Sequence, residues 1–157
     1  MALSTYADLQ AAVAEWLERS DLSARIPDFI ALAEVQINRA LRQREMMRRA
    51  SAIISEPFSA APDDLAEARL ITLSDGNGEW ELAPATPDQI ASFAVIGEVG
   101  RPRFWSLVGT EFRYYPAPDG SYAARLLYYG RTPSLTNAAP TNWLLANHPD
   151  VLLFGAL

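Results

Sequence analysis

Two acidic residues, Glu79 and Glu81, are the best candidates for catalysis in this sequence. They flank Trp80 in the segment EWELA, so a strand would place both carboxylates on one face. Glycoside hydrolases use two carboxylates about 5–10 Å apart, and a neighbouring tryptophan suits a sugar ring. The pattern therefore allows a carboxylate-pair hydrolase. We favour the simpler interpretation, in which the glutamates form a solvated strand face and Trp80 lies in the core.

The single histidine, His148, is a second candidate, because Asp150 follows two residues later and could orient it as a base. A position in a loop or at a helix N-terminus is the simpler interpretation. The chain has no cysteine, which excludes disulfides, cysteine nucleophiles and cysteine-based zinc sites. No Gly-x-Ser-x-Gly elbow, Walker loop or metal-ligand spacing is present in the sequence. We therefore expect no enzyme activity, no cofactor and no metal site.

The most concentrated charge is a group of arginines between residues 39 and 49, with one glutamate among them. Arginine makes bidentate contacts and suits interfaces, and every basic residue of this chain is arginine. Three interpretations stay open: pairing within the chain or solvation, contact with an acidic protein partner, and contact with nucleic acid. The net charge of −6 argues against a broad nucleic-acid surface. The candidate protein-interface residues are Arg39, Arg42, Arg44, Arg48 and Arg49.

The arginines come at the end of the longest helical pattern in the chain, residues 26–49. Its apolar residues recur every three or four positions, which places them along one side of a helix. They are Ile26, Ile30, Ala33, Ile37 and Leu41, with Phe29 and Leu32 beside them. An earlier amphipathic helix should begin after Thr5, with Asp8 completing a capping-box-like arrangement. Its expected buried residues are Leu9, Ala12, Val13, Trp16 and Leu17. A turn at residues 20–23 joins the two helices, so we expect an antiparallel helical hairpin over residues 1–49.

The rest of the chain predicts an α+β fold. Residues 50–131 should form an inserted antiparallel β subdomain, with a hairpin of residues 69–74 and 79–83 around the turn Asp75–Gly78. Residues 50–55 should form a strand and residues 57–63 a loop. A second hairpin is expected over residues 104–115 and a strand over residues 122–129. One short helix should begin at Pro87, with Thr86 as its cap, and bury Ile90 and Phe93. Residues 132–157 should be an extended segment and the start of a C-terminal helix that packs back on the hairpin. No run of about 18 apolar residues predicts a membrane span.

Short segments along nearly the whole chain match, in order, a known family. The first are Tyr6–Leu9, Trp16–Leu22, Ile26–Glu34, Ile37–Arg39 and Leu41–Arg42. The later ones are Gly100–Pro102, Tyr115–Pro118, Leu127–Tyr129, Asn142–Leu145 and His148–Asp150. On these segments the chain resembles the head-to-tail connector, or adaptor, proteins of tailed bacteriophages and prophages.

The resemblance implies a structural role without catalysis. Such proteins form a ring, commonly of twelve copies, beneath the portal protein, where they extend the DNA channel and dock a tail or stopper protein. The implied partners are therefore the portal, further copies of the chain, the tail component, and passing DNA that is not bound sequence-specifically; no membrane is implied. The implied location is the head–tail junction of the virion, after synthesis in the bacterial host cytoplasm. Family members usually continue with a longer C-terminal helical segment that engages the portal, so we expect the last helix here to be incomplete.

Two other functions compete with this one. The first is a virion-associated peptidoglycan hydrolase that uses Glu79 and Glu81 or another carboxylate pair. The second is a small DNA-binding module that acts through the arginines.

Overall fold

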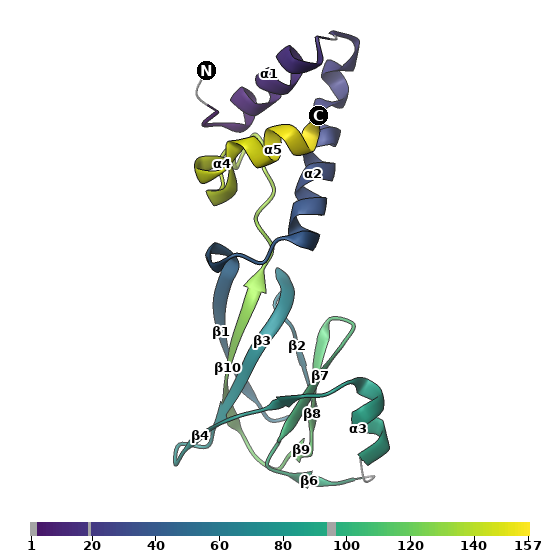
Figure 1. Cartoon of the computed structure of the whole chain (residues 1–157). Helices are drawn as coiled ribbons and strands as arrows, with labels where there is room; N and C mark the ends of the chain where they lie inside the picture. Colours follow the sequence, from purple (N-terminus) through teal and green to yellow (C-terminus); the bar gives the residue numbers. More distant parts are fainter. Residues whose placement is uncertain (1–2, 19, 94–96) are drawn as a thin grey trace. The chain divides into compact units, whose positions relative to one another are not determined.

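The chain folds into two compact units, each with its own hydrophobic core. A computed structural model describes residues 3–18, 20–93 and 97–157 (Figure 1). The helical unit consists of Met1–Met46 together with Arg131–Leu157, and the β unit consists of Met47–Gly130. Helices dominate the first unit and mainly antiparallel strands the second, which confirms the predicted α+β class.

The helical unit contains four α-helices and two short 3-10 helices among the described residues. They are α1 (Tyr6–Leu17), η1 (Ser20–Arg25), α2 (Ile26–Ala40), η2 (Arg44–Met46), α4 (Trp143–Asn147) and α5 (Pro149–Ala156). The predicted capping box at the start of α1 is present. The Asp8 N–H donates to Thr5 Oγ1 at 3.2 Å, and the Thr5 N–H donates to Asp8 Oδ2 at 3.0 Å.

The core of the helical unit is formed where α1, α2, α4 and α5 meet. Its fully buried side chains include Leu9, Val13, Ile30, Leu145 and Leu152. Helix α5 packs closely on α2, because a Cβ atom added at Gly155 would lie 3.2 Å from the Ala33 Cβ atom. The contact between α5 and this side of α2 is part of the same core.

Three details of the helical prediction were wrong. The helix that begins at Ile26 ends at Ala40 rather than near residue 49. The Trp16 and Leu32 side chains, both expected on buried faces, are 60% and 61% exposed. Residues 143–147, expected to be extended, form the short helix α4, whose N-cap Asn142 accepts a hydrogen bond from the Leu145 N–H at 2.8 Å.

The described residues of the β unit form two four-stranded sheets and a small two-stranded one. The strands of the first sheet, in spatial order, are β1 (Met47–Ile54), β10 (Tyr122–Gly130), β3 (Leu65–Ser74) and β4 (Glu79–Glu81). Those of the second are β2 (Phe58–Ala60), β8 (Glu111–Tyr115), β7 (Phe104–Val108) and β5 (Ala83–Pro84). The third pairs β6 (Val99–Gly100) with β9 (Ala117–Pro118), and the one helix among the described residues of this unit is α3 (Pro87–Phe93). Side chains from the two large sheets share one core, built around Ile71, Leu73, Leu82, Trp105 and Phe112.

The local signals in the β unit were predictive. The β3–β4 hairpin has the expected turn, in which the Asp75 carboxylate accepts from the backbone N–H groups of Asn77 and Gly78. The β7–β8 hairpin and the strand over residues 122–129 are also confirmed, and Thr86 caps α3 by accepting from the Gln89 N–H. The loop expected at residues 57–63 contains the short strand β2, and the predicted side-chain burial of Phe93 falls outside the described residues. No described helix has the length and apolar character needed to cross a bilayer.

Candidate functional site

The five candidate arginines do not lie on one helix. Arg39 is in the last turn of α2, Arg42 follows the helix, Arg44 is in η2, and Arg48 and Arg49 are in β1. The first three belong to the helical unit and the last two to the β unit. The single helix expected over residues 26–49 therefore does not carry all five of them. The reason is the pairing of β1, because all eight of its residues are in antiparallel register with β10, and tertiary pairing overrides a local helical preference.

Arg42 acts within the helical unit. Its Nη1 atom donates to the carbonyl oxygens of Asn38 at 3.0 Å and Leu41 at 2.6 Å. Carbonyl groups in the last turn of a helix have no partner inside the helix, and a guanidinium there also interacts favourably with the negative end of the helix dipole. This side chain therefore helps to end α2 at Ala40, while the Leu41 N–H still bonds to the Ile37 carbonyl at 2.8 Å.

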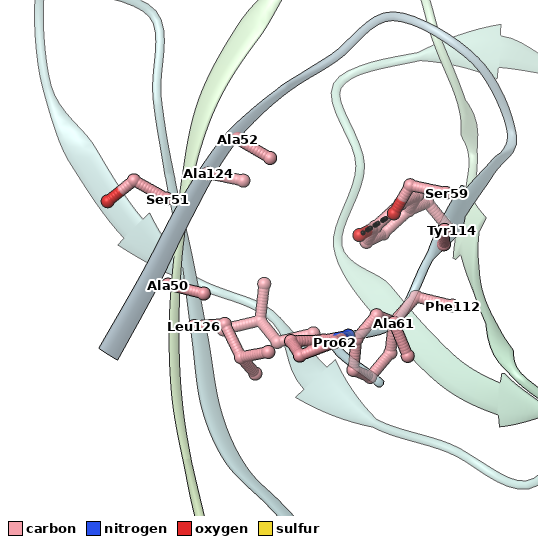
Figure 2. Close-up of a pocket in the computed structure, with 12 residues that line it drawn as sticks. Ala50, Ser51, Ala52, Ser59, Ala61, Pro62, Phe112, Tyr114, Ala124 and Leu126 are labelled. Carbon is pink, nitrogen blue, oxygen red and sulfur yellow. Dashed lines mark hydrogen bonds between the residues drawn. The ribbon is translucent and has the colours of Figure 1, made fainter. Parts of the chain in front are cut away.

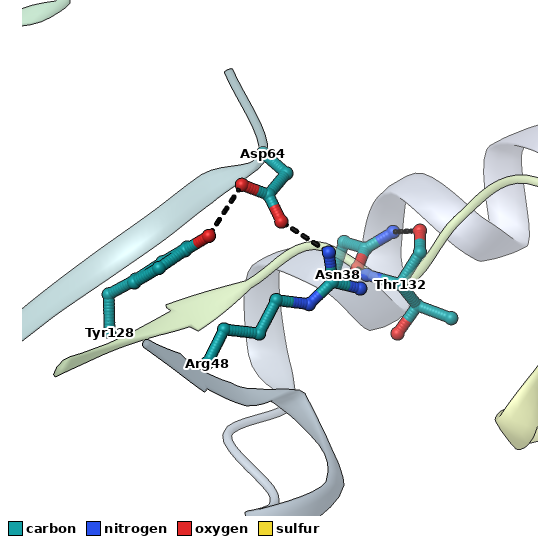
Figure 3. Close-up of polar contacts among 5 residues, drawn as sticks. All are labelled: Asn38, Arg48, Asp64, Tyr128 and Thr132. Carbon is teal, nitrogen blue, oxygen red and sulfur yellow. Dashed lines mark hydrogen bonds and ion pairs between the residues drawn. The ribbon is translucent and has the colours of Figure 1, made fainter. Parts of the chain in front are cut away.

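Arg48 acts within the β unit. Its guanidinium forms an ion pair with Asp64, and the other carboxylate oxygen of Asp64 accepts from the Tyr128 hydroxyl at 2.9 Å (Figure 3). Burial, together with the hydrogen bond to Asp64, raises the pKa of Tyr128 above its ordinary value. Gly130 leaves room for this cluster, since a Cβ atom there would lie 2.6 Å from Arg48 Cδ and 2.8 Å from Asp64 Oδ2. Glycine is needed at this position because of the close approach.

Replacing Gly130 with alanine is expected to lower the free energy of unfolding of the β unit by about 1 kcal/mol, because the new methyl group displaces Arg48 from Asp64. Urea unfolding measures the change. Gly120→Ala is the matched control, since a Cβ atom there meets nothing within 4 Å. In an Arg48→Ala background, the cost of Gly130→Ala should shrink, because the two residues interact directly. An equal cost in both backgrounds would contradict this account.

The remaining candidates, Arg39, Arg44 and Arg49, are exposed. Arg44 is 90% exposed at its side chain and lies 3.6 Å from Glu45, a geometry that contributes little to stability. Among the described residues, no ion pair joins Arg39 or Arg49 to an acidic group. These three guanidinium groups are therefore available for contacts outside the chain.

The carboxylate pair Glu79 and Glu81 lies on one exposed face of β4, as predicted. Glu79 is engaged with its neighbours, since Arg125 lies 3.1 Å away and the Thr72 hydroxyl donates to it at 3.0 Å. The Trp80 side chain points to the core, and its Nε1–H donates to the Pro102 carbonyl at 2.9 Å. The Arg101 guanidinium lies 3.5 Å from the centroid of this tryptophan ring. Trp80 is therefore not an open platform for a sugar.

A hollow of the β unit with a volume of about 240 Å³ lies between β1 and the sheet containing β2 and β8 (Figure 2). Small side chains such as Ala52 and Ala60 form part of its wall, and Ile71 and Phe112 also line it. Its polar side chains are hydroxyls, two of which, Ser59 and Tyr114, bond to each other at 2.8 Å. Since no carboxylate, imidazole or guanidinium lines the hollow, the catalytic candidates are not gathered there.

His148 is exposed and occupies the N-cap position of α5, next to Pro149. Its ring meets that of Trp143 edge to face, with ring centroids 6.5 Å apart. Asp150 follows in the first turn of α5, where a carboxylate is favoured by the helix dipole. In the part of the chain that the structure describes, no three metal-ligating side chains gather.

Glu34 is a buried carboxylate that the sequence did not single out. It lies on the core side of α2, where its Oε1 atom accepts from the Leu135 N–H at 2.8 Å. Burial raises its pKa above the ordinary 4.5, while hydrogen bonds from Leu135 and Ser134 act in the opposite direction. Glu34 directly follows Ala33, which belongs to the apolar pattern of this helix. This position was the signal in the sequence that the Glu34 side chain lies next to the buried side of α2. Its role is to hold residues 134–135 against α2.

Replacing Glu34 with glutamine should flatten the pH dependence of the helical unit. The pKa of Glu34 is raised in the folded state, so its contribution to the stability of the wild type is fully present below about pH 4.5. This contribution is lost as the pH rises through the folded-state pKa. Urea unfolding at a series of pH values should therefore show Glu34→Gln overtaking the wild type across that window. Glu34→Ala should cost about 1–3 kcal/mol at pH 7, since the Leu135 N–H loses its acceptor. Parallel pH profiles for wild type and Glu34→Gln would contradict the account.

A family model described as SU10 adaptor protein matches residues 4–157, which is nearly the whole chain. The chain belongs to this family of phage adaptor proteins. None of the curated proteins compared with the chain matches it. As a phage structural adaptor it associates with other head or tail proteins and is a component of the virion.

Proposed function

We propose that this adaptor joins the head and tail of a tailed phage or prophage particle, as a ring beneath the portal. In this role it extends the DNA channel, lets DNA pass without sequence-specific binding, and presents the docking surface for a tail or stopper protein. The observation that carries the proposal is the family match over residues 4–157. The described residues support it, because they contain exposed charged and apolar surfaces but bring no nucleophile, base and cleft together.

Electron microscopy of the full-length chain mixed with the portal protein of the same particle tests the proposal. The expected result is a ring of adaptor density, commonly twelvefold, beneath the portal. A mixture in which the two proteins stay separate at every concentration would contradict it. Zymography on peptidoglycan distinguishes the hydrolase alternative: a lytic band that disappears with Glu79→Gln or Glu81→Gln would favour an enzyme.

We further propose that arginines of the candidate group contact acidic surfaces of neighbouring subunits or of the portal. Arg42 and Arg48 already make contacts inside their own units. We therefore expect Arg39, Arg44 and Arg49, which are exposed, to make the contacts with other proteins. Complementary charges of this kind speed association and fix orientation.

Reversing the charge of one of these three arginines should weaken assembly of the ring or its binding to the portal. Arg39→Glu is expected to lower the apparent affinity for ring or portal assembly by about tenfold, equivalent to about 1.4 kcal/mol. The defect should grow as ionic strength falls, because screening then weakens. Arg103→Glu is the control, since Arg103 is equally exposed but lies outside the group. Light scattering during titration with portal measures the apparent affinity of both variants. Equal affinities of Arg39→Glu and Arg103→Glu would show that Arg39 does not lie in the interface.

A further inference from the structure

The helical unit carries an exposed apolar face on the side of α2 that points away from its core. Leu32 and Val35 are both exposed, although they lie within a helix whose other side buries Ile30 and Ala33. Their spacing of three residues places them one above the other on the helix surface, and Arg39 follows one turn later on the same side. We call Leu32, Val35 and Arg39 the α2 face.

A second exposed apolar face lies on α5. Val151 and Phe154 are also three residues apart, on the side opposite the buried Leu152 and Leu153. Phe154 continues the surface towards α1, since its ring meets Trp16 edge to face with centroids 5.8 Å apart. We call Trp16, Val151 and Phe154 the α5 face.

The α5 face extends into a hollow of about 220 Å³ at the Val151 end. Leu41, Trp143 and Val151 give the hollow apolar walls, and Glu45 and His148 also line it. Asp150 is exposed next to Val151. Two carboxylates therefore border this end of the α5 face; Glu45 has Arg44 beside it at 3.6 Å, so Asp150 is the carboxylate that an incoming cation can approach more directly. The α2 face, in contrast, ends in the guanidinium of Arg39.

We propose that the α2 face of one copy docks antiparallel on the α5 face of a second copy, an inference that rests on the ring assembly proposed above. The two pairs of apolar side chains have the same spacing along their helices, so Leu32 can meet Phe154 while Val35 meets Val151. The antiparallel direction then brings Arg39 to the end bordered by Asp150 and Glu45. Charge complementarity thus selects the direction, and the hollow receives side chains from the neighbouring α2.

A contact between two different faces also accounts for both surfaces at once. Each copy uses its α2 face on one neighbour and its α5 face on the other, which is the heterologous arrangement that builds a ring when the rotation closes. An α5-to-α5 contact would instead bring Asp150 and Glu45 of two copies together. An α2-to-α2 contact would leave Trp16 and Phe154 in water.

Two variants that each block one face test the assignment. Leu32→Glu blocks the α2 face, Phe154→Glu blocks the α5 face, and both positions are more than half exposed, so the core is retained. Sedimentation velocity should show assembly of the wild-type chain and monomers for each variant alone. An equal mixture of the two should form a dimer and nothing larger, because one intact face of each kind remains. A single variant that dimerises alone would overturn the proposal in favour of a symmetric contact.

Cysteine crosslinking keeps the test independent of assembly size, because the sequence of residues 1–157 contains no cysteine. Full-length Val35→Cys mixed with Val151→Cys should form a disulfide-linked dimer under mild oxidation, faster than either variant does alone. Thr110→Cys, exposed in the β7–β8 turn, is the control and should crosslink slowly with both. Equal rates in all mixtures overturn the contact.

The outcome is separable from the head–tail role. Rings on the portal that survive both Leu32→Glu and Phe154→Glu would overturn this contact while leaving the proposed function in place. A specific Val35–Val151 crosslink in a chain that never binds the portal would support the contact and contradict the function.

Discussion

Replacing Ile30 with alanine is expected to lower the free energy of unfolding of the helical unit by about 2–5 kcal/mol. Ile30 is 1% exposed on the core side of α2 and belongs to the cluster formed with α1, α4 and α5. The substitution removes three carbon atoms and leaves a cavity, and helix packing as close as that of Gly155 on Ala33 limits how far the walls can move inward. Little of the lost contact can therefore be recovered by relaxation.

Leu32→Ala is the matched control, two residues away on the same helix. Because Leu32 is 61% exposed, its truncation should change the unfolding free energy by less than about 0.5 kcal/mol. Urea unfolding, monitored by hydrogen exchange of peptides from residues 1–46 and 131–157, measures the unfolding free energy of the helical unit separately from that of the β unit. Working at low protein concentration keeps the chain monomeric, so that assembly does not contribute. Similar losses for the two variants would show that α2 does not pack as described.

Features that depend on a few neighbouring residues were predictable from the sequence. Thr5 and Asp8 cap α1, the Asp75 carboxylate organises the β3–β4 turn, and Thr86 caps α3. Each of these signals works through hydrogen bonds between residues two or three apart, so the rest of the chain need not be known. The α+β class follows from the same local signals, added along the chain.

Features that depend on distant residues were not predictable. Residues 47–49 were expected to continue the helix, with a strand only from residue 50, but β10, which begins at Tyr122, pairs with all eight residues of β1. The same limit applies to exposure: Trp16 lies on the apolar side of α1, yet it is near the helix end, where Phe154 covers only part of it. Helical periodicity identifies which side of a helix is buried. It does not show how far along the helix other elements of the fold pack against that side.

The candidate arginines show how this limit affects the site. Their types and closeness in sequence predicted a basic region, but their contacts depend on residues far along the chain. Arg48 meets Asp64 and the strand that contains Gly130, and Arg42 bonds to carbonyl groups that became available only because α2 ends at Ala40. The exposed apolar residues Leu32 and Phe154 could not be told from core residues by type alone. Surface sites of this kind become visible only when the core is known.

Replacing Ile71 with alanine is expected to destabilise the β unit by about 2–5 kcal/mol. Ile71 is 2% exposed on β3, an interior strand that pairs with both β10 and β4. Its side chain also lines the hollow of about 240 Å³. Truncation to alanine therefore enlarges a hollow that is already present in the wild type. The surrounding sheets are held by backbone pairing on both sides of β3, which leaves them little freedom to close the gap.

Ile53→Ala makes the same chemical change in the same sheet and should cost less than about 1 kcal/mol, because Ile53 is 76% exposed on β1. Hydrogen exchange of peptides from residues 65–74 and 122–130 reports the opening of this sheet. Protection there should fall strongly for Ile71→Ala and stay close to wild type for Ile53→Ala. The helical unit has its own core, so protection in residues 26–40 should stay unchanged in both variants. A parallel loss of protection in α2 would mean that the two units unfold as one, because cooperative unfolding exposes both cores together.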